Sequence, residues 1–294
     1  MILLLMFLMT PLWASAASGD NGQLSFTGEV FSEREAMKAF FGNVEARQDD
    51  SVLSLLIPGG GPTYLYSRWK REEYCTPENI RKYGYLGDGQ YRTFLDNLGW
   101  YHDVYSWEVL RFQVQGVEKA FQITQSETCD AQPCYAAIGV FLWTRDGKGW
   151  RLEKAAPCLT GMGIYGSSHA QSELVRTGQA NYGILFTSTF DDLVIATVVL
   201  VDEQGHLRVV FNDTVGDGNN YVSAGMDEGI PEGQHYQYWG NISFEPGKNK
   251  KYWDMLVRYE GTRLKYENRG YGKGQKVIPY NLRKRYVYSQ GRYR

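Results

Sequence analysis

The sequence predicts a mainly β protein, propeller-like or sandwich-like, in which antiparallel strands repeat behind a short helical N-terminal section. Aromatic residues make up 15% of the chain, including 22 tyrosines, and 33 glycines stand against 9 prolines. This composition is typical of a fold with many short strands joined by tight turns, because aromatic side chains favour strands and glycine favours turns. From about Trp107 onward, apolar and polar residues alternate with the period of two that a half-buried strand requires.

The first twenty residues, MILLLMFLMTPLWASAASGD, predict an export signal. Their apolar run covers roughly a dozen residues, fewer than the ~20 of a membrane-spanning helix, and the small residues Ala14, Ser15 and Ala16 follow it where a signal peptidase cuts. The first basic residue is Arg34, so the usual basic start of a signal is missing, and a buried N-terminal strand or helix is the alternative. We predict a signal peptide over residues 1–16, a periplasmic or secreted protein, and no transmembrane segment after signal removal.

Export would place the four cysteines, Cys75, Cys129, Cys134 and Cys158, in an oxidising compartment, where even numbers of thiols form disulfides. Three pairings are possible. The short spacing in CDAQPC favours a bond between Cys129 and Cys134, which leaves Cys75 to join the N-terminal section to Cys158. A zinc or redox site is the alternative, but it requires shorter spacing or neighbouring histidines.

Residues 17–106 predict a section of helix and loop. In FSEREAMKAFFG, Ser32 stands as an N-cap with Glu35 three residues later, which is a capping box, and Gly42 is a helix stop signal. The segment therefore predicts a short helix. Its apolar face is expected to carry Ala36, Ala39 and Phe40.

Residues 107–294 predict a repeat of β-strands. Three segments share one design, an apolar strand, a polar turn with Gly, then an aromatic residue or Leu followed by Arg: FLWTRDGKGWR, VLVDEQGHLR and YVYSQGRYR. Arg151 and Arg208 lie 57 residues apart, and the pair Tyr182-Gly183 recurs as Trp239-Gly240 at the same offset. A period of nearly sixty residues with several strands indicates a propeller blade or a set of sandwich hairpins.

The segment DTVGDGNNYVSAG, which starts at Asp213, resembles the FG-GAP repeat of β-propellers, whose loop reads D-x-N-G-D-G-x-x-D before apolar residues and a Gly. The matching positions are Asp213, Gly216, Asp217, Gly218 and Gly225. Val215 and Tyr221 stand at two positions where the family has oxygen ligands. The resemblance implies a propeller-like fold and a calcium site with ligands from Asp213, Asp217 and Asn219.

No catalytic residue is predicted. The histidines lack metal-binding spacing, and Ser167 and Ser168 beside His169 lack the GxSxG elbow of serine hydrolases. The alternative function is a secreted hydrolase of cell-envelope glycan that uses carboxylates at turns of the repeat. The adjacent acidic pairs are Glu72-Glu73, Asp191-Asp192 and Asp227-Glu228.

Charge is divided unevenly along the chain. Residues 248–294 contain 14 Lys and Arg against 3 Asp and Glu, a net charge of +11, whereas the preceding 247 residues have a net charge of −13. Basic residues between tyrosines predict a surface for an anionic polymer. The predicted surface residues are Lys273, Lys276, Tyr286, Tyr288, Arg292, Tyr293 and Arg294.

An alternative is that these residues alternate along strands and that the acidic body of the same chain is their partner. We favour an exported, non-enzymatic binding or envelope-associated protein. Its expected partner is an acidic envelope glycan or an acidic protein, and not nucleic acid.

Overall fold

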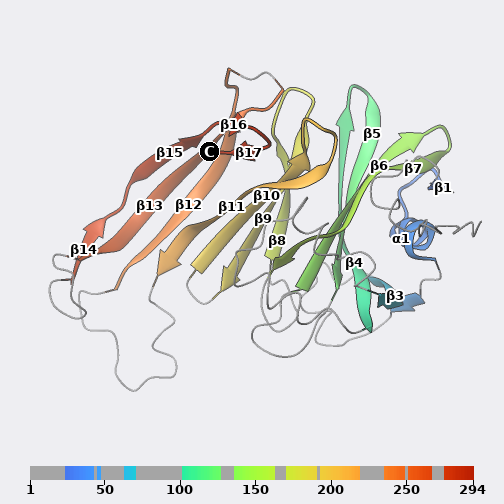
Figure 1. The fold of residues 1–294 in the computed structure, drawn as a ribbon, viewed down its shortest axis with the longest axis horizontal. Helices are drawn as coiled ribbons and strands as arrows, with labels where there is room; N and C mark the ends of the chain where they lie inside the picture. The colour runs from blue at the N-terminus through green and yellow to red at the C-terminus, as the bar shows by residue number, and fades with distance from the viewer. Residues whose placement is uncertain are drawn as a thin grey trace, which may run out of the picture.

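The computed structural model describes residues 24–42, 45–47, 63–70, 101–126, 136–162, 170–190, 193–218, 235–248, 251–266 and 275–294. In this part the protein is mainly β, with antiparallel strands in two large sheets and a helix beside the first (Figure 1). The predictions of a mainly β fold and of a short N-terminal helix are confirmed. No helix within these ranges is long and apolar enough to cross a bilayer. The predicted signal peptide, residues 1–16, lies outside the described residues.

The first sheet has seven strands in the order β1-β7-β6-β5-β4-β3-β2. In chain order they are β1 Ser25–Thr27, β2 Glu45–Arg47, β3 Thr63–Lys70, β4 Tyr101–Val114, β5 Val117–Ser126, β6 Ala136–Asp146 and β7 Gly149–Met162. Because β4 runs through residues 106 and 107, the two predicted regions, 17–106 and 107–294, share this sheet.

The helix α1, Glu33–Phe41, is capped as the sequence predicts. The Ser32 hydroxyl accepts a hydrogen bond from the backbone N–H of Glu35 at 3.3 Å, and Gly42 ends the helix with a φ of 91°. The buried face differs from the expected one by about one residue along the helix. It is formed by Ala36, Met37 and Phe41, whereas Ala39 and Phe40 are half-buried at its border. Phe40 still contacts Phe141 of β6, with ring centroids 4.7 Å apart.

A buried polar network holds the start of α1 on the sheet. The Ser106 hydroxyl donates to the Glu33 carboxylate at 2.8 Å, and the Gln122 amide donates to the Glu33 carbonyl at 3.3 Å. The indole N–H of Trp143 in turn donates to the Gln122 side chain at 3.2 Å. Burial raises the pKa of Glu33, and the Ser106 hydrogen bond opposes this rise.

The second sheet has eight strands. Seven follow the order β14-β13-β12-β11-β10-β9-β8, and the eighth, β15, pairs with the first part of β13, whereas β14 pairs with its last part. The strands are β8 Ala170–Arg176, β9 Tyr182–Phe190, β10 Leu193–Val201, β11 Leu207–Gly218, β12 Gln237–Glu245, β13 Asp254–Tyr266, β14 Gln275–Pro279 and β15 Leu282–Tyr286. An apolar cluster joins the two sheets, and in it Trp107 of β4 stacks on Phe186 of β9 with centroids 6.1 Å apart. The described sheets are larger than the four-stranded blades of a propeller.

The three segments of repeated design fold as hairpins. They are β6–β7, β10–β11 and the small C-terminal hairpin of β16, Tyr288–Ser289, with β17, Arg292–Tyr293. In the first two, the shared arginine reaches back across its own turn to an aspartate. Arg151 Nε lies 3.2 Å from Asp146 Oδ2, and Arg208 Nε lies 3.4 Å from Oδ2 of the buried Asp202. In the third, Arg294 donates to the Gln290 side chain at 3.1 Å.

Strands β12–β15, which we call the wing, are attached to the rest of the second sheet through a narrow joint. Among the described residues, β11 and β12 pair at two positions, Asp217 with Tyr238 and Gly218 with Gln237. The C-terminal hairpin packs at the other end of these strands (Figure 1), where Gly291 approaches Arg208 of β11 and Tyr293 contacts Phe244 of β12. The hairpin therefore supplements a joint that few backbone hydrogen bonds hold.

Two tyrosines fix the C-terminal hairpin to the core. Tyr288 and Tyr293 are 4% and 6% exposed. The Tyr293 hydroxyl donates to the Trp253 carbonyl at 3.0 Å, and the Tyr288 ring stacks on Tyr252 with centroids 4.1 Å apart. Burial raises the pKa of both hairpin tyrosines, and that of Tyr288 reaches about 12.

Candidate functional site

Three tyrosines cluster on one side of the wing, which we call the wing face. Tyr238 of β12, Tyr259 of β13 and Tyr280, between β14 and β15, lie in mutual contact. Their ring centroids are 6.1 Å apart for Tyr238 and Tyr259, 4.8 Å for Tyr238 and Tyr280, and 5.5 Å for Tyr259 and Tyr280. Tyr238 and Tyr280 are half-buried, so part of each ring reaches solvent.

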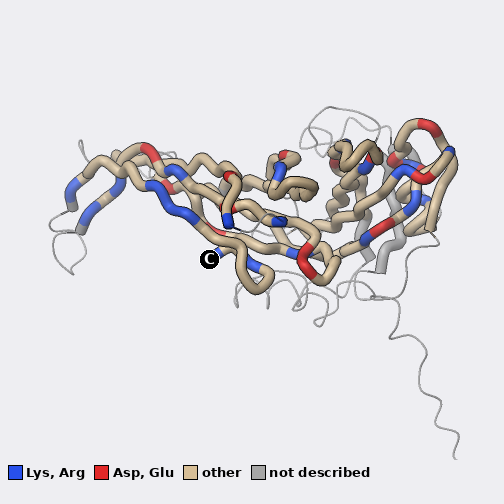
Figure 2. The backbone as a smooth tube through the Cα atoms, turned by 90° about the horizontal axis from the view of Figure 1, so that it is seen from above, with Lys and Arg blue, Asp and Glu red and all other residues tan. Residues whose placement is uncertain are grey.

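Four exposed cations lie on the same side of the wing as these rings. The Arg263 guanidinium lies 4.4 Å from the Tyr280 ring centroid, and the Lys284 ammonium lies 5.3 Å from that of Tyr259. Lys265 lies two residues beyond Arg263 on β13 and therefore shares its side, and Lys276 of β14 stands directly opposite Lys265. Within the described part of the chain, none of the four forms an ion pair. Figure 2 shows this concentration of basic residues at the wing end of the molecule.

The opposed lysines carry a cost. Like charges directly opposite in an antiparallel pair destabilise it, by roughly the 0.2–1 kcal/mol that a favourable pair would contribute. An anion bound between Lys265 and Lys276 would remove this repulsion. The pair is thus better suited to binding than to stabilising the sheet.

The inner border of the wing face is acidic. In the β11–β12 register Asp217 stands opposite Tyr238, and the Tyr236 hydroxyl lies 3.4 Å from both carboxylate oxygens of Asp217. Asp213 is exposed on the same strand. Burial, and secondarily the charge of Asp217, raises the pKa of Tyr238. Across the wing the face therefore changes from carboxylates to aromatic rings and then to cations.

The opposite side of the wing has a different charge arrangement. Arg283 Nη2 lies 3.2 Å from Glu245, and Arg285 Nε lies 2.8 Å from the buried carboxylate of Asp254. Glu245 belongs to the acidic body that the alternative interpretation names as partner, whereas Asp254 lies within the basic segment itself.

The residues predicted for polyanion binding are distributed over several places. Lys276 and Tyr286 lie on the wing, where Tyr286 packs on Phe211 with centroids 5.1 Å apart. Tyr288 and Tyr293 lie in the core, because both point from the C-terminal hairpin into it. The remaining predicted residues are Arg292 and Arg294, exposed on the hairpin, and Lys273, outside the described residues.

Residues outside the predicted set of surface residues complete the wing face: Tyr238, Tyr259, Arg263, Lys265, Tyr280 and Lys284. The available signal was the alternation of Arg263 and Lys265 on one strand.

Two of the three predicted calcium ligands lie within the described residues, and both are on one strand. Asp213 and Asp217 both belong to β11, whose extended backbone separates their Cα atoms by roughly 10 Å or more. Asn219 lies outside the described residues. Within the described residues, no group of three or more His, Cys, Asp or Glu side chains is placed to hold a metal ion. The FG-GAP resemblance and the calcium site stay predictions.

Several other predicted residues lie outside the described part of the chain. They are Cys75, Cys129, Cys134 and the acidic pairs at 72–73, 191–192 and 227–228. Cys158 is buried in β7, with 4% of its surface exposed. The disulfide pairing and the hydrolase alternative therefore stay predictions.

Comparisons with known protein families, curated proteins and solved structures found no match for this chain.

Proposed function

We propose that this protein is an exported, non-enzymatic binding protein that holds an acidic glycan on the wing face. The observation that supports this most directly is the contact between Arg263 and the Tyr280 ring, at 4.4 Å, within a group of exposed cations that have no acidic partner among the described residues. A stacked guanidinium keeps its N–H donors in a fixed plane, which suits two-point binding of a carboxylate.

Each part of the wing face matches a chemical group of an acidic glycan. Sugar rings present apolar C–H faces that pack on aromatic side chains such as Tyr238 and Tyr280. Sugar carboxylates would lie near Arg263, Lys276 and Lys284, and sugar hydroxyls would donate to Asp217. Charged contacts on an exposed surface are screened by salt, so this binding should weaken steeply as ionic strength rises.

Polygalacturonate, a carboxylated glycan, is a suitable probe for titration calorimetry at about 50 and 200 mM salt, a range over which multiple ionic contacts lose much affinity. The triple variant Arg263→Gln, Lys276→Gln, Lys284→Gln should bind at least about tenfold more weakly, equivalent to about 1.4 kcal/mol. It should also show a smaller dependence on salt.

The matched control removes the same charge from the other side of the wing, with Arg258→Gln, Arg283→Gln and Arg285→Gln. Arg258 of β13 stands opposite Arg283 and therefore shares its side. On this proposal the control retains most of its affinity. Equal losses in the two triple variants would indicate attraction by net charge alone and would overturn the site. Thermal melts of both variants show whether the wing is still folded.

A second pair of probes separates a glycan from an acidic protein as the partner. Tyr280→Ala should weaken binding of polygalacturonate, which has sugar rings, more than binding of polyglutamate, which has none. Equal losses for the two polymers would favour an acidic protein. Polygalacturonate should also keep its chain length during incubation, whereas shortening would favour the hydrolase alternative.

A further inference from the structure

Strand β1 ends the first sheet on one side, and within the part of the chain that the structure describes no strand pairs with its outer edge. Gly28 donates its backbone N–H to the Lys148 carbonyl at 3.0 Å, and the Leu24 carbonyl accepts from the Leu152 N–H at 2.9 Å. In an antiparallel pair these bonds alternate along the strand, so the backbone groups of Ser25 and Thr27 point away from β7. Within the described residues these groups have no backbone partner, and both side chains are exposed.

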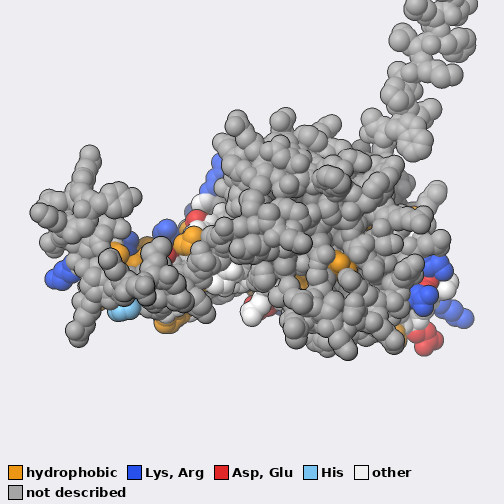
Figure 3. All heavy atoms as spheres, turned by 90° about the horizontal axis from the view of Figure 1, so that it is seen from below, with side chains coloured by type: hydrophobic (Ala, Val, Ile, Leu, Met, Phe, Trp, Pro, Cys, Tyr) orange, Lys and Arg blue, Asp and Glu red, His pale blue; other side chains and the backbone are white. Residues whose placement is uncertain are grey.

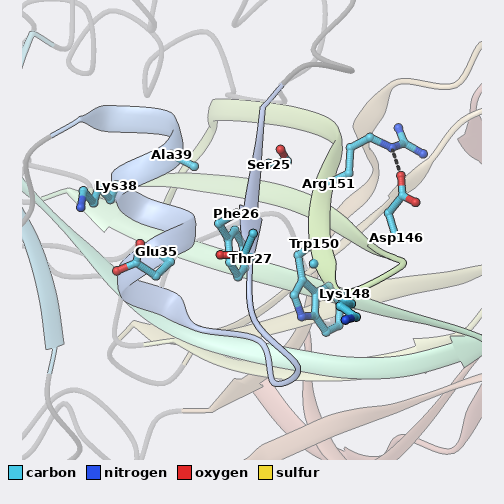
Figure 4. Close-up of a pocket in the computed structure, with 11 residues that line it drawn as sticks. Ser25, Phe26, Thr27, Glu35, Lys38, Ala39, Asp146, Lys148, Trp150 and Arg151 are labelled. Carbon is cyan, nitrogen blue, oxygen red and sulfur yellow. Dashed lines mark hydrogen bonds and ion pairs between the residues drawn. The ribbon is translucent and has the colours of Figure 1, made fainter.

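Strand β1 also lines a groove of about 730 Å³, within the ~300–1,000 Å³ range of small-ligand sites. Ser25 and Thr27 line it together with the α1 residues Glu35, Lys38 and Ala39. The turn between β6 and β7 contributes the other wall, with Asp146, Lys148 and Arg151. Figure 4 shows β1 between the helix and this turn.

The charges of the groove favour an acidic occupant. Arg151 and Asp146 neutralise each other at 3.2 Å, which leaves Lys38, Lys148 and Glu35 without an ion pair among the described residues. One cation then stands on each wall, and the remaining net charge is positive. Figure 3 shows basic and acidic side chains together at the end of the molecule near β6 and β7.

We propose that this groove binds an extended acidic segment of a partner protein, which adds to the first sheet as a strand beside β1. Such a strand lies about 4.8 Å from its neighbour, and its backbone would pair with the N–H and C=O groups of Ser25 and Thr27. Its acidic side chains would lie near Lys38 and Lys148. The site is separate from the wing face and does not depend on the proposed glycan binding.

The decisive variant is Thr27→Pro. It removes the outward N–H of Thr27 but none of the described β1–β7 hydrogen bonds, because proline is tolerated on an edge strand where its nitrogen faces solvent. The matched control, Thr27→Val, keeps that N–H and removes the hydroxyl. The probe is an end-blocked pentapeptide of alternating valine and glutamate, and the comparison peptide replaces glutamate with lysine.

We expect binding of the acidic peptide to slow hydrogen exchange at the amides of Ser25 and Thr27 in the full chain. Thr27→Pro should weaken binding about tenfold, the effect of one lost hydrogen bond plus steric exclusion of the new strand, and Thr27→Val should bind like the unchanged chain. If Thr27→Pro lowers the melting temperature, the double variant Lys38→Glu, Lys148→Glu replaces it. That variant should reverse the preference toward the lysine peptide.

Binding that is equal in the proline and valine variants would overturn strand addition. Equal affinity for both peptides would overturn the acidic specificity. A third outcome is that the chain binds no peptide but self-associates in sedimentation, and that Thr27→Pro abolishes this self-association. It would identify a second copy of this chain as the occupant and would also overturn the proposal.

Discussion

The C-terminal hairpin should determine whether the wing stays attached, and Tyr293 is the residue at which to test this. Tyr293 is 6% exposed, packs on Phe244 with centroids 5.9 Å apart, and donates its hydroxyl to the Trp253 carbonyl at 3.0 Å. We expect Tyr293→Ala to destabilise the protein by about 3–5 kcal/mol, the usual cost of truncating a buried aromatic side chain.

The conservative variant Tyr293→Phe separates packing from hydrogen bonding. It keeps the ring and leaves the Trp253 carbonyl without its donor, so we expect a loss of about 1–3 kcal/mol. Arg294→Gln is the control. The Arg294 side chain is exposed, and its described hydrogen bond is to the exposed Gln290 of the same hairpin. Its effect should stay within about 0.5 kcal/mol.

Urea unfolding followed by circular dichroism measures the free energies, and hydrogen exchange locates the loss. In Tyr293→Ala the amides of β12 and β13 should exchange faster than those of β5 and β6, because the wing has lost its second attachment. Uniform acceleration over both sheets, or a cost below about 1 kcal/mol, would show that the hairpin does not hold the wing.

Three further outcomes are expected. Burial raises the pKa of Tyr288 from 10.0 to about 12, so its contribution to stability is complete below pH 10 and is lost as the pH rises toward 12. The midpoint of urea unfolding should therefore fall between pH 10 and 12, and the absorbance of tyrosinate should rise over the same interval. Because burial raises the pKa of Glu33 above 4.5, the charged form is disfavoured in the folded protein, and stability should decline as the pH rises above 4.5. Glu33→Gln should reduce this decline and be the more stable protein at neutral pH, as thermal melts across pH would show. Gly261→Ala should lower the free energy of unfolding in urea by more than about 1 kcal/mol, because Gly261 has a φ of 130° and the new Cβ would clash with the Gln237 carbonyl. Gly42→Ala should cost less, because no atom lies within 4 Å of its Cβ position.

The features that the sequence predicted correctly depend on neighbours in the chain. Ser32 and Gly42 bound α1 through capping interactions within a few residues, and the Gly-containing turns specify the three hairpins. The partnership of distant strands is not encoded locally, because the alternation of side chains does not determine which strand pairs with which. The sequence therefore indicated repeated hairpins but could not distinguish propeller blades from two large sheets.

The wing face shows the same limit. Tyr280, Tyr288 and Tyr293 have similar basic surroundings in the sequence, yet Tyr280 lies on the wing face and the other two are buried. The difference arises because β16 and β17 fold back over the core as a separate hairpin. Arg263, Tyr238 and Tyr280 meet only through the pairing of β13 with β12 and β14, which connects residues far apart in the chain.

The narrow joint between β11 and β12 has a consequence for the order of assembly during synthesis. The hairpin that supplements it contacts the β10–β11 region, where Gly291 approaches Arg208, about eighty residues earlier in the chain. A chain that emerges from its N-terminus can complete the first sheet and the hairpins through β11 while the wing is still unsecured. The side of β11 that later pairs with β12 would then be exposed for the time needed to make the wing and its hairpin. A chaperone that shields strand edges would be most useful to this protein during that interval.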